Sequence, residues 1–386
     1  MPFQRTKNIN LSPIKAIELK ASGIPDVISL AQGIPSFDTP EVIKKAAAKA
    51  LSRGDVAKYS LTLGLPELRE TVEEKIAKEG MFYDFEKEIL VTVGSIEAIT
   101  ASLVSAVNKE KDEVLLLSPC YTSYQEAVKV AGGKPVFVEL DENKNWQINF
   151  QKLEEKINSK TAAILFANPN NPTGTIFPKN DLLKIADLAL KNDFFIILDE
   201  VYKDFIYDDI DFFTLASKPE LRKKVIRAFS FSKAYAMTGW RIGFLHTDED
   251  NVREIVKVHD TMVTCAPVIS QYAAIGAFDF ADKEIEEFKK QFVVRRDLAC
   301  RHLDKLSEFL SYKKPSGSYF VFPKLLKEDD SWKFTLDLLE KAHVAVVPGV
   351  AFGPNGEGYI RINFGRDEKD INEAFKRIGK YLKGKK

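Results

Sequence analysis

The sequence predicts an α/β protein built on a mostly parallel β-sheet. Short, continuous runs of Val, Ile, Leu and Phe recur between residues 88 and 230, and they alternate with amphipathic helical stretches. Strands that are buried on both faces have this composition, and a helix between two of them can connect parallel neighbours. With 386 residues, the chain is also long enough for two domains.

Bulk composition narrows the class of protein. The 56 basic and 56 acidic residues give a formal net charge of zero, so nothing favours a nucleic acid or an anionic membrane as partner. No apolar run is long enough to span a bilayer, and the first five residues do not resemble the start of a signal peptide. The three cysteines lie far apart and the four histidines lack ligand spacing, which favours a cytoplasmic protein without a metal site.

The expected elements follow in chain order. The first 38 residues are expected to form an extended arm with one short helix over residues 13–22. Thr39 is expected to cap a helix that runs to about residue 53, with Pro40 in its first turn and Glu41 near its positive end. Strands are then expected over residues 88–93, 114–117, 135–139, 162–166, 194–198 and 225–229, and helices over residues 95–107, 121–131 and 179–191.

The last third of the chain alternates strand and helix again. A long helix over residues 282–311 is expected to bridge two domains, and the Lys-rich end, residues 380–386, reads as a solvated tail. Between them, strands are expected over residues 319–322, 344–347 and 359–363, and helices over residues 331–341 and 368–382.

Lys233 is the central candidate for chemistry, because it follows the predicted strand 225–229, and ligands of parallel sheets bind at the carboxyl ends of strands. Its amine can form a Schiff base with an aldehyde. Ser230 and Arg241 offer a hydroxyl group and a planar cation to a phosphate. An aldehyde and a phosphate on one small molecule indicate pyridoxal 5′-phosphate. For an isolated Lys–Arg pair, a solvated surface loop would be the alternative.

The complete string SFSKAYAMTGWRIG, residues 230–243, resembles the active-site lysine segment of class I pyridoxal-phosphate aminotransferases of fold type I. The strings NPNNPTG, residues 168–174, and GLPELR, residues 64–69, resemble the same family. The resemblance covers nearly the whole chain. It implies a large domain over residues 45–285 with a mostly parallel seven-stranded sheet, a small α/β domain over residues 286–386, and an arm over residues 1–44 that completes the small domain.

The resemblance also implies how the cofactor would be held at its phosphate end. Gly94, Ser95 and Ile96 lie where a strand meets a helix, and the free N–H groups of a helix start bind anions. They would form a phosphate cup with Ser230 and Arg241.

Around the ring, the family pattern places Tyr121 flat against the cofactor, with core packing as the alternative. Asn171 and Tyr202 would bond the phenolate oxygen. Asp199 ends a buried strand, where an unpaired carboxylate would be costly, and it would keep the pyridine nitrogen protonated. Tyr59 would reach the phosphate in a partner subunit, which implies a homodimer with shared sites; a core or surface aromatic is the alternative.

Two further residues are implied for the substrate. Gly33 would lie beside the α-carboxylate, with a plain turn as the alternative, and Asn171 would also contact the substrate. Arg361, a charge within a predicted strand, would clamp that carboxylate with two parallel hydrogen bonds, with a structural salt bridge as the alternative.

The resulting hypothesis is ping-pong transamination from an L-amino acid to a 2-oxo acid, with Lys233 moving the proton of the α-carbon. The family resemblance implies 2-oxoglutarate as that oxo acid. Some aspartate-preferring relatives carry a lysine where this chain has Ile96, and others an arginine in the segment that is residues 258–267 here, where none occurs. Broad aromatic, methionine or kynurenine-type specificity is therefore favoured over strict aspartate specificity.

A C–S β-lyase is the alternative, because the same cofactor cage supports elimination. A DNA-binding regulator or a structural protein is disfavoured, since no basic helix-turn-helix is present and the candidate residues are intact.

Overall fold

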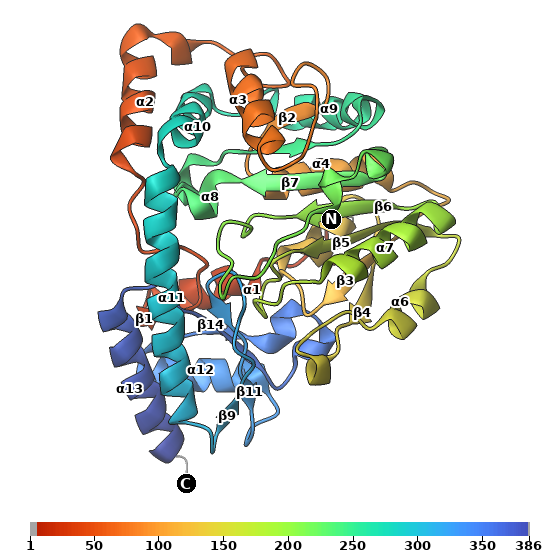
Figure 1. The fold of residues 1–386 in the computed structure, drawn as a ribbon. Coiled ribbons are helices and arrows are strands. Elements are labelled where there is room, and N and C mark those ends of the chain that lie inside the picture. The colour runs from red at the N-terminus through yellow and green to blue at the C-terminus, as the bar shows by residue number, and fades with distance from the viewer. Residues whose placement is uncertain (1–5, 385–386) are drawn as a thin grey trace.

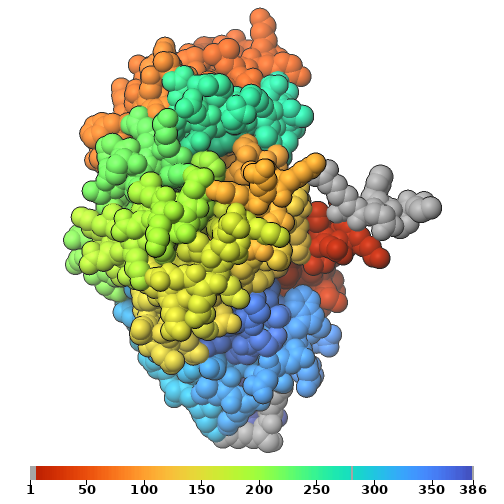
Figure 2. Space-filling view, turned by 90° about the vertical axis from the view of Figure 1, so that its right-hand side faces the viewer, coloured from red at the N-terminus to blue at the C-terminus, as the bar shows by residue number. Residues whose placement is uncertain are grey.

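The computed structural model describes residues 6–384, so the first five residues of the predicted arm and the last two of the predicted tail lie outside the described residues. Figure 1 shows a large α/β body around one sheet, with a smaller α/β part below it that is built from the C-terminal residues. Figure 2 shows the N-terminal segment in red at the surface, between these two parts.

The large body contains a seven-stranded sheet in the order β2-β8-β7-β6-β5-β3-β4. Neighbouring strands are parallel except at β8, which runs antiparallel to both β2 and β7. The predicted mostly parallel α/β fold is thereby confirmed. The strands are β2 (Ile89–Thr92), β3 (Glu113–Ser118), β4 (Lys134–Glu139), β5 (Thr161–Ala167), β6 (Phe195–Asp199), β7 (Val225–Ser230) and β8 (Gly243–His246).

Both faces of this sheet are covered, which explains why its strands are almost entirely apolar. In β3, Leu115 and Leu117 join one hydrophobic cluster, and Val114 and Leu116 join another, because successive side chains point to opposite faces. One cluster includes apolar residues of α7 (Lys179–Asn192) and α10 (Val268–Phe280). The other includes residues of α4 (Ser95–Ala106), α5 (Ser123–Val130) and α9 (Glu249–Val263).

The smaller part contains three short sheets. Strand β14 (Ile360–Asn363) pairs antiparallel with β10 (Phe320–Val321) and β13 (Val347–Pro348). Strand β9 (Leu310–Ser311) pairs with β11 (Lys324–Leu325). The N-terminal strand β1 (Ile28–Ser29) pairs in parallel with β12 (Val344–Ala345), so the N-terminal segment contributes to the C-terminal part. The domain boundaries at residues 44 and 285 remain a prediction.

The remaining helices frame these sheets. They are α1 (Pro13–Ala21), α2 (Glu41–Arg53), α3 (Pro66–Ala77), α6 (Phe150–Lys156), α8 (Phe231–Ala234), α11 (Asp282–Asp304), α12 (Ser331–Ala342) and α13 (Glu368–Gly384). In Figure 1, α11 runs along one side of the molecule from the large body to the smaller part. Within residues 6–384, no helix combines the length and apolar character needed to cross a membrane.

The predicted Thr39 cap is wrong. Helix α2 starts at Glu41 with Pro40 at its N-cap, and no side chain caps it. The Thr39 hydroxyl instead donates to the Ala236 carbonyl oxygen at 2.7 Å and accepts from Trp240 Nε1 at 3.1 Å. Because the Thr39 side chain is buried against the segment that follows Lys233, tertiary hydrogen bonds replace the local cap.

Most predicted elements agree with the structure to within one or two residues, and three differences change a pairing or the position of a site residue. The helix expected over residues 282–311 ends at Asp304, and its last residues instead form β9. The single strand expected over residues 344–347 is two strands, β12 and β13, with different partners. Helix α5 begins at Ser123 rather than at residue 121, which leaves Tyr121 in the loop before it. The elements that the sequence patterns did not predict include α3, α6, α9, α10 and the antiparallel strand β8.

Candidate active site

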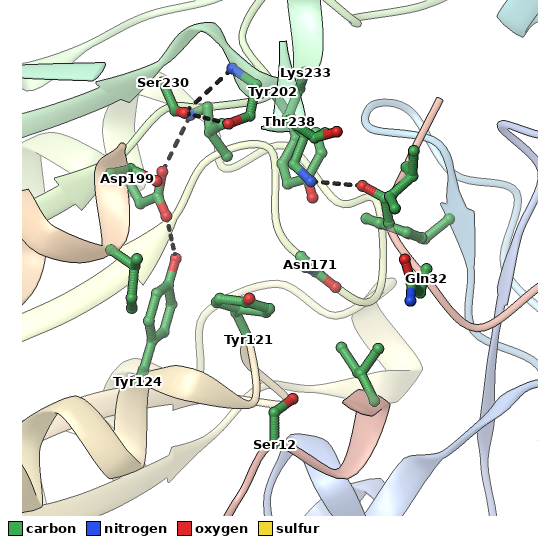
Figure 3. Close-up of a pocket in the computed structure, with 18 of the residues that line it drawn as sticks. Ser12, Gln32, Tyr121, Tyr124, Asn171, Asp199, Tyr202, Ser230, Lys233 and Thr238 are labelled. Atoms are coloured by element: carbon green, nitrogen blue, oxygen red, sulfur yellow. Dashed lines mark hydrogen bonds between the residues drawn. The ribbon is translucent and has the colours of Figure 1, made fainter. Parts of the chain in front are cut away.

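A cavity of about 330 Å³ opens at the carboxyl ends of the parallel strands, and the N-terminal segment and the smaller part close its other sides. Figure 3 shows Asp199, Ser230 and Lys233 on one side of it, with Asn171 and Tyr121 facing them. Most of the predicted site residues line this cavity together: Gly33, Ser95, Ile96, Tyr121, Asn171, Asp199, Tyr202, Ser230, Lys233, Arg241 and Arg361.

Lys233 enters the cavity from α8, the short helix that follows β7. Its Nζ donates a 2.5 Å hydrogen bond to the Gly33 carbonyl oxygen, which Figure 3 marks. Burial, together with the charges of Arg361 and Arg241, lowers the pKa of Lys233 to about 8, and the Asp199 carboxylate opposes this shift. A substantial fraction of this amine is therefore neutral near pH 8, as a nucleophile or a proton acceptor requires.

Asp199 is the last residue of β6 and is almost fully buried. Its carboxylate accepts hydrogen bonds from the Tyr124 hydroxyl at 2.8 Å and from the Val201 N–H at 3.2 Å. Burial raises the pKa of Asp199 to about 6, while these two hydrogen bonds lower it. Within residues 6–384 it forms no ion pair, so a buried acid without a cationic partner faces the cavity.

Gly94 does not line the cavity, but it shapes the anion-binding end. It precedes α4 with a φ of 77°, and a Cβ atom there would lie 2.9 Å from an Nη atom of Arg241. The Arg241 guanidinium donates only to the carbonyl oxygens of Thr238 and Val93, and it has no carboxylate partner among the described residues. An unpaired guanidinium beside a helix N-terminus suits a phosphate group.

Ser230 lies between β7 and α8, next to this anion-binding end. Its Oγ accepts from the Ser232 N–H at 3.2 Å and lies 2.9 Å from the Ser232 hydroxyl, to which it can donate. Ser232 also lines the cavity, so two hydroxyl groups rather than one are available to an anion.

Arg361 is fully buried in β14, and burial lowers its pKa to about 10. Its guanidinium donates to the Asn171 side-chain oxygen at 3.0 Å and to the Ala31 carbonyl oxygen. The Nε atom has no hydrogen-bond partner, and no carboxylate of the described residues pairs with this cation. The salt-bridge alternative therefore has no support within residues 6–384, and the group is free to bind an anion.

Aromatic side chains form the walls. The Tyr121 ring lies edge-on to Tyr124, with 5.5 Å between ring centroids. The Tyr202 ring packs edge-on against Tyr319 and Phe320, and Lys233 Nζ lies 6.0 Å from its centroid. The predicted contacts of Tyr121 and Tyr202 with a cofactor stay predictions.

Tyr59 lies apart from this cavity. Its side chain is 84% exposed and does not line the site of its own chain. The proposed contact with a partner subunit's site stays a prediction.

Several lining residues were missed by the sequence patterns, among them Tyr124, Ser232, Lys15, Gln32, Thr238 and Phe320. Tyr124 lies three residues after Tyr121, a spacing that brings side chains to one side of a helical turn, so this signal was present in the sequence. Lys15 and Gln32 carry no such signal, because only the fold of the N-terminal segment brings them to the cavity. The described residues include no group of His, Cys, Asp or Glu side chains arranged to hold a metal ion.

Comparison with known proteins identifies related sequences. A family model described as aminotransferase class I and II matches residues 25–378. The chain is 40% identical over 382 residues to an aspartate aminotransferase of Pyrococcus abyssi, covering 98% of this chain and 97% of that protein. It is 39% identical over 386 residues to aromatic-amino-acid aminotransferase 2 of Thermococcus litoralis, covering 99% and 98%.

Solved structures of aminotransferases also resemble this chain. The structure of an aromatic aminotransferase from Pyrococcus horikoshii superposes with a TM-score of 0.89 at 38% identity, covering 96% of this chain and 99% of that chain. The structure of an aspartate aminotransferase from Thermus thermophilus with maleate superposes with a TM-score of 0.92 at 32% identity, covering 99% and 100%.

Proposed function

Because the chain belongs to the class I and II aminotransferase family, we propose that the cavity described above is its transamination site and that the predicted residues act there in the roles that follow. The enzyme is an aminotransferase, and its family uses pyridoxal 5′-phosphate. Bound at this site, the cofactor supplies an aldehyde that takes up the amino group and a protonated ring that withdraws electrons from the substrate's α-carbon.

The residues of the cavity fit this cofactor. The buried Asp199 forms no ion pair with any described residue and suits a pyridinium nitrogen. The unpaired Arg241, the helix start after Gly94 and the Ser230 and Ser232 hydroxyl groups suit the phosphate. Lys233 lines the cavity close to the strand ends, and its amine suits the aldehyde.

One observation carries the proposal: Arg361, a buried guanidinium without a carboxylate, faces the same cavity as Lys233, an amine of lowered pKa. In the proposed reaction Arg361 holds the substrate's α-carboxylate, with Asn171 fixing the guanidinium. Lys233 Nζ then accepts the proton of the α-carbon and later returns it. Gly33, whose carbonyl oxygen holds Nζ before substrate binds, lies beside this position.

For substrates, we propose aspartate-like and aromatic L-amino acids as donors and 2-oxoglutarate as acceptor. The names of the relatives, aspartate and aromatic-amino-acid aminotransferases, support this range. Nothing in the site or among the relatives favours the C–S β-lyase alternative. We also propose a homodimer in which Tyr59 reaches the partner's site, supported by its 84% exposure, and a cytoplasmic location, supported by three free cysteines.

A panel of amino acids and oxo acids tests the reaction on the purified holoenzyme. We expect transfer from aspartate, phenylalanine, methionine and kynurenine to 2-oxoglutarate, with no preference for aspartate as large as about a hundredfold. We expect Lys233→Ala to abolish single-turnover conversion, because this change removes the amine that is proposed to move the α-proton. Full-rate conversion by this variant would remove Lys233 from the proposed role, and release of pyruvate from cysteine without an oxo acid would support the lyase instead.

A further inference from the structure

The charges of the cavity wall are unbalanced. Among the described residues that line it, four side chains are cationic, Lys15, Lys233, Arg241 and Arg361, whereas Asp199 is the only carboxylate. Three of these cations have a partner under the proposed function, on which this inference rests. Lys233 binds the aldehyde, Arg241 the phosphate and Arg361 the α-carboxylate of the substrate. Lys15 is left over.

Lys15 is placed to meet the far end of a substrate. It belongs to α1, in the N-terminal segment that closes the cavity opposite the strand ends. In Figure 3 its neighbour Ser12 lies beyond Tyr121, away from Ser230 and Asp199. The Lys15 side chain is exposed and forms no ion pair or side-chain hydrogen bond among the described residues. A free ammonium group therefore stands at the cavity entrance.

Apart from the four cations and Asp199, the described residues of the cavity wall are uncharged. Ile14, Ile34 and Ile96 contribute apolar side chains to this wall, and Gln32 contributes an uncharged amide. Some aspartate-preferring relatives have a second cation at one of two positions, and this chain has none at either. Residue 96 is Ile, and residues 258–267 contain no arginine. Lys15 is thus the one cation of the described wall that can neutralise an anionic substrate side chain.

We infer that Lys15 is a specificity-determining residue that binds the side-chain carboxylate of dicarboxylic substrates, namely the acceptor 2-oxoglutarate and the donor aspartate. A lysine ammonium on a flexible four-carbon stem can also turn out to solvent. When an aromatic side chain enters, Ile14, Ile34 and Ile96 contact it and the ammonium stays hydrated. One subsite then accepts both chemical classes in turn, as transfer from an aromatic amino acid to 2-oxoglutarate requires.

The test compares Lys15→Met with wild-type holoenzyme. Methionine keeps most of the apolar stem and removes the charge, and Lys15→Arg keeps the charge. The matched control is Lys20→Met, which removes an exposed charge from the same helix outside the cavity wall. We measure kcat/KM for 2-oxoglutarate, aspartate, phenylpyruvate and phenylalanine.

We expect Lys15→Met to lower kcat/KM about tenfold for the two dicarboxylic substrates and less than about twofold for the two aromatic ones. Lys15→Arg and Lys20→Met should stay within about threefold of wild type for all four substrates. An equal loss for both classes, or no loss for the dicarboxylic class, would overturn the role of Lys15.

A binding measurement separates this inference from the proposed function. Succinate has two carboxylates and no reactive group, and butyrate has one. By calorimetry, Lys15→Met should weaken succinate binding about tenfold and leave butyrate binding unchanged. Wild-type protein that transfers no amino group would contradict the proposed function, while unchanged succinate affinity in Lys15→Met would contradict the role of Lys15 alone.

Discussion

At the scale of a single residue, the charged form of the buried Asp199 carboxyl group lowers the stability of the cofactor-free protein. The folded protein holds the proton of this carboxyl group up to about pH 6, whereas its ordinary pKa is 3.8. The folded state therefore binds more protons between these values, so the free energy of unfolding falls as the pH rises from about 4 to 6. Above pH 6 the full penalty of a buried, unpaired carboxylate is present.

We expect Asp199→Asn to stabilise the cofactor-free protein at pH 8, by at most roughly 3 kcal/mol for a shift of about two pKa units. The amide can accept from the Val201 N–H and donate to the Tyr124 oxygen, so packing is retained. At pH 4 the wild-type carboxyl group is itself neutral, and the two proteins should be equally stable. Urea unfolding at both pH values measures this, and an equal gain at pH 4 would contradict the proposed ionisation.

Tyr124 acts on Asp199 through one hydrogen bond of 2.8 Å. This bond lowers the pKa of Asp199, so Tyr124→Phe should raise that pKa in the cofactor-free protein. We expect the fall in the free energy of unfolding with rising pH to extend above pH 6 in this variant, which urea unfolding at several pH values measures.

Tyr312→Phe is the matched control for Tyr124→Phe, because its hydroxyl bonds Asp304 in the smaller part, far from the cavity lining. It should leave the pH profile unchanged. A Tyr124→Phe protein that is less stable by the same amount at every pH would show that Tyr124 only packs.

At the scale of elements, the junction of β2 and α4 decides where a phosphate can bind. Gly94 turns the chain with a φ of 77° and leaves room for Arg241 to cross the helix start. Ser230 and Gly243 face each other across β7 and β8, so Arg241, two residues before β8, reaches the same edge of the sheet. The ends of β2, β7 and β8 at this edge of the sheet thus together form the anion site.

We expect Gly94→Ala to weaken pyridoxal phosphate binding about tenfold or more, because the new Cβ would lie 2.9 Å from the Arg241 guanidinium. Gly132→Ala is the control, since Gly132 has a φ of 84° but no atom within 4 Å of its would-be Cβ. Both variants should lose about 1 kcal/mol of stability from the left-handed backbone. An absorbance titration with the cofactor that finds equal weakening in both variants would rule out displacement of Arg241.

At the scale of the whole molecule, the site depends on segments that are remote in sequence. Arg361 of the smaller part bonds Asn171 of the large body and Ala31 of the N-terminal segment. Lys233 and Tyr319 both donate to the Gly33 carbonyl oxygen. The cavity therefore exists only when both parts and the N-terminal segment are in place.

The proposed dimer adds a second chain to this arrangement. In a mixed dimer of Tyr59→Phe and Lys233→Ala chains, one site would combine an intact Tyr59 with an intact Lys233. We expect that site to bind pyridoxal phosphate as tightly as wild type, whereas the Tyr59→Phe homodimer binds it about 5- to 10-fold more weakly through loss of a hydrogen bond to a charged group. Titration of both species measures this, and equal weakening in the mixed dimer would contradict a shared site.

Local patterns were sufficient for much of the fold. The apolar runs of β2, β3, β5, β6 and β7 are nearly continuous because both faces of those strands are covered, whereas the edge strand β4 is only partly buried. Strand β8 was missed because only two of its four residues, Phe244 and Leu245, form an apolar run, whereas the equally short β2 carries three consecutive apolar residues. The predicted helix over residues 282–311 was too long because the polar–apolar pattern continues past Asp304, where α11 ends. The last two of these residues pair with β11 as strand β9.

By itself, the sequence determined the α/β class, the strand ends and, through two motifs and the junctions after predicted strands, most of the predicted residues that line the cavity. Those features depend on near neighbours in the chain: turn residues, apolar runs and the junctions after them. The tertiary structure alone decided that Thr39 bonds Ala236 instead of capping a helix, that Tyr124 supports Asp199, and that Lys15 reaches the cavity. The reason is physical: the partner of a hydrogen bond can lie far away in the chain, 75 positions for Tyr124 and Asp199 and 197 for Thr39 and Ala236, and no local pattern records it.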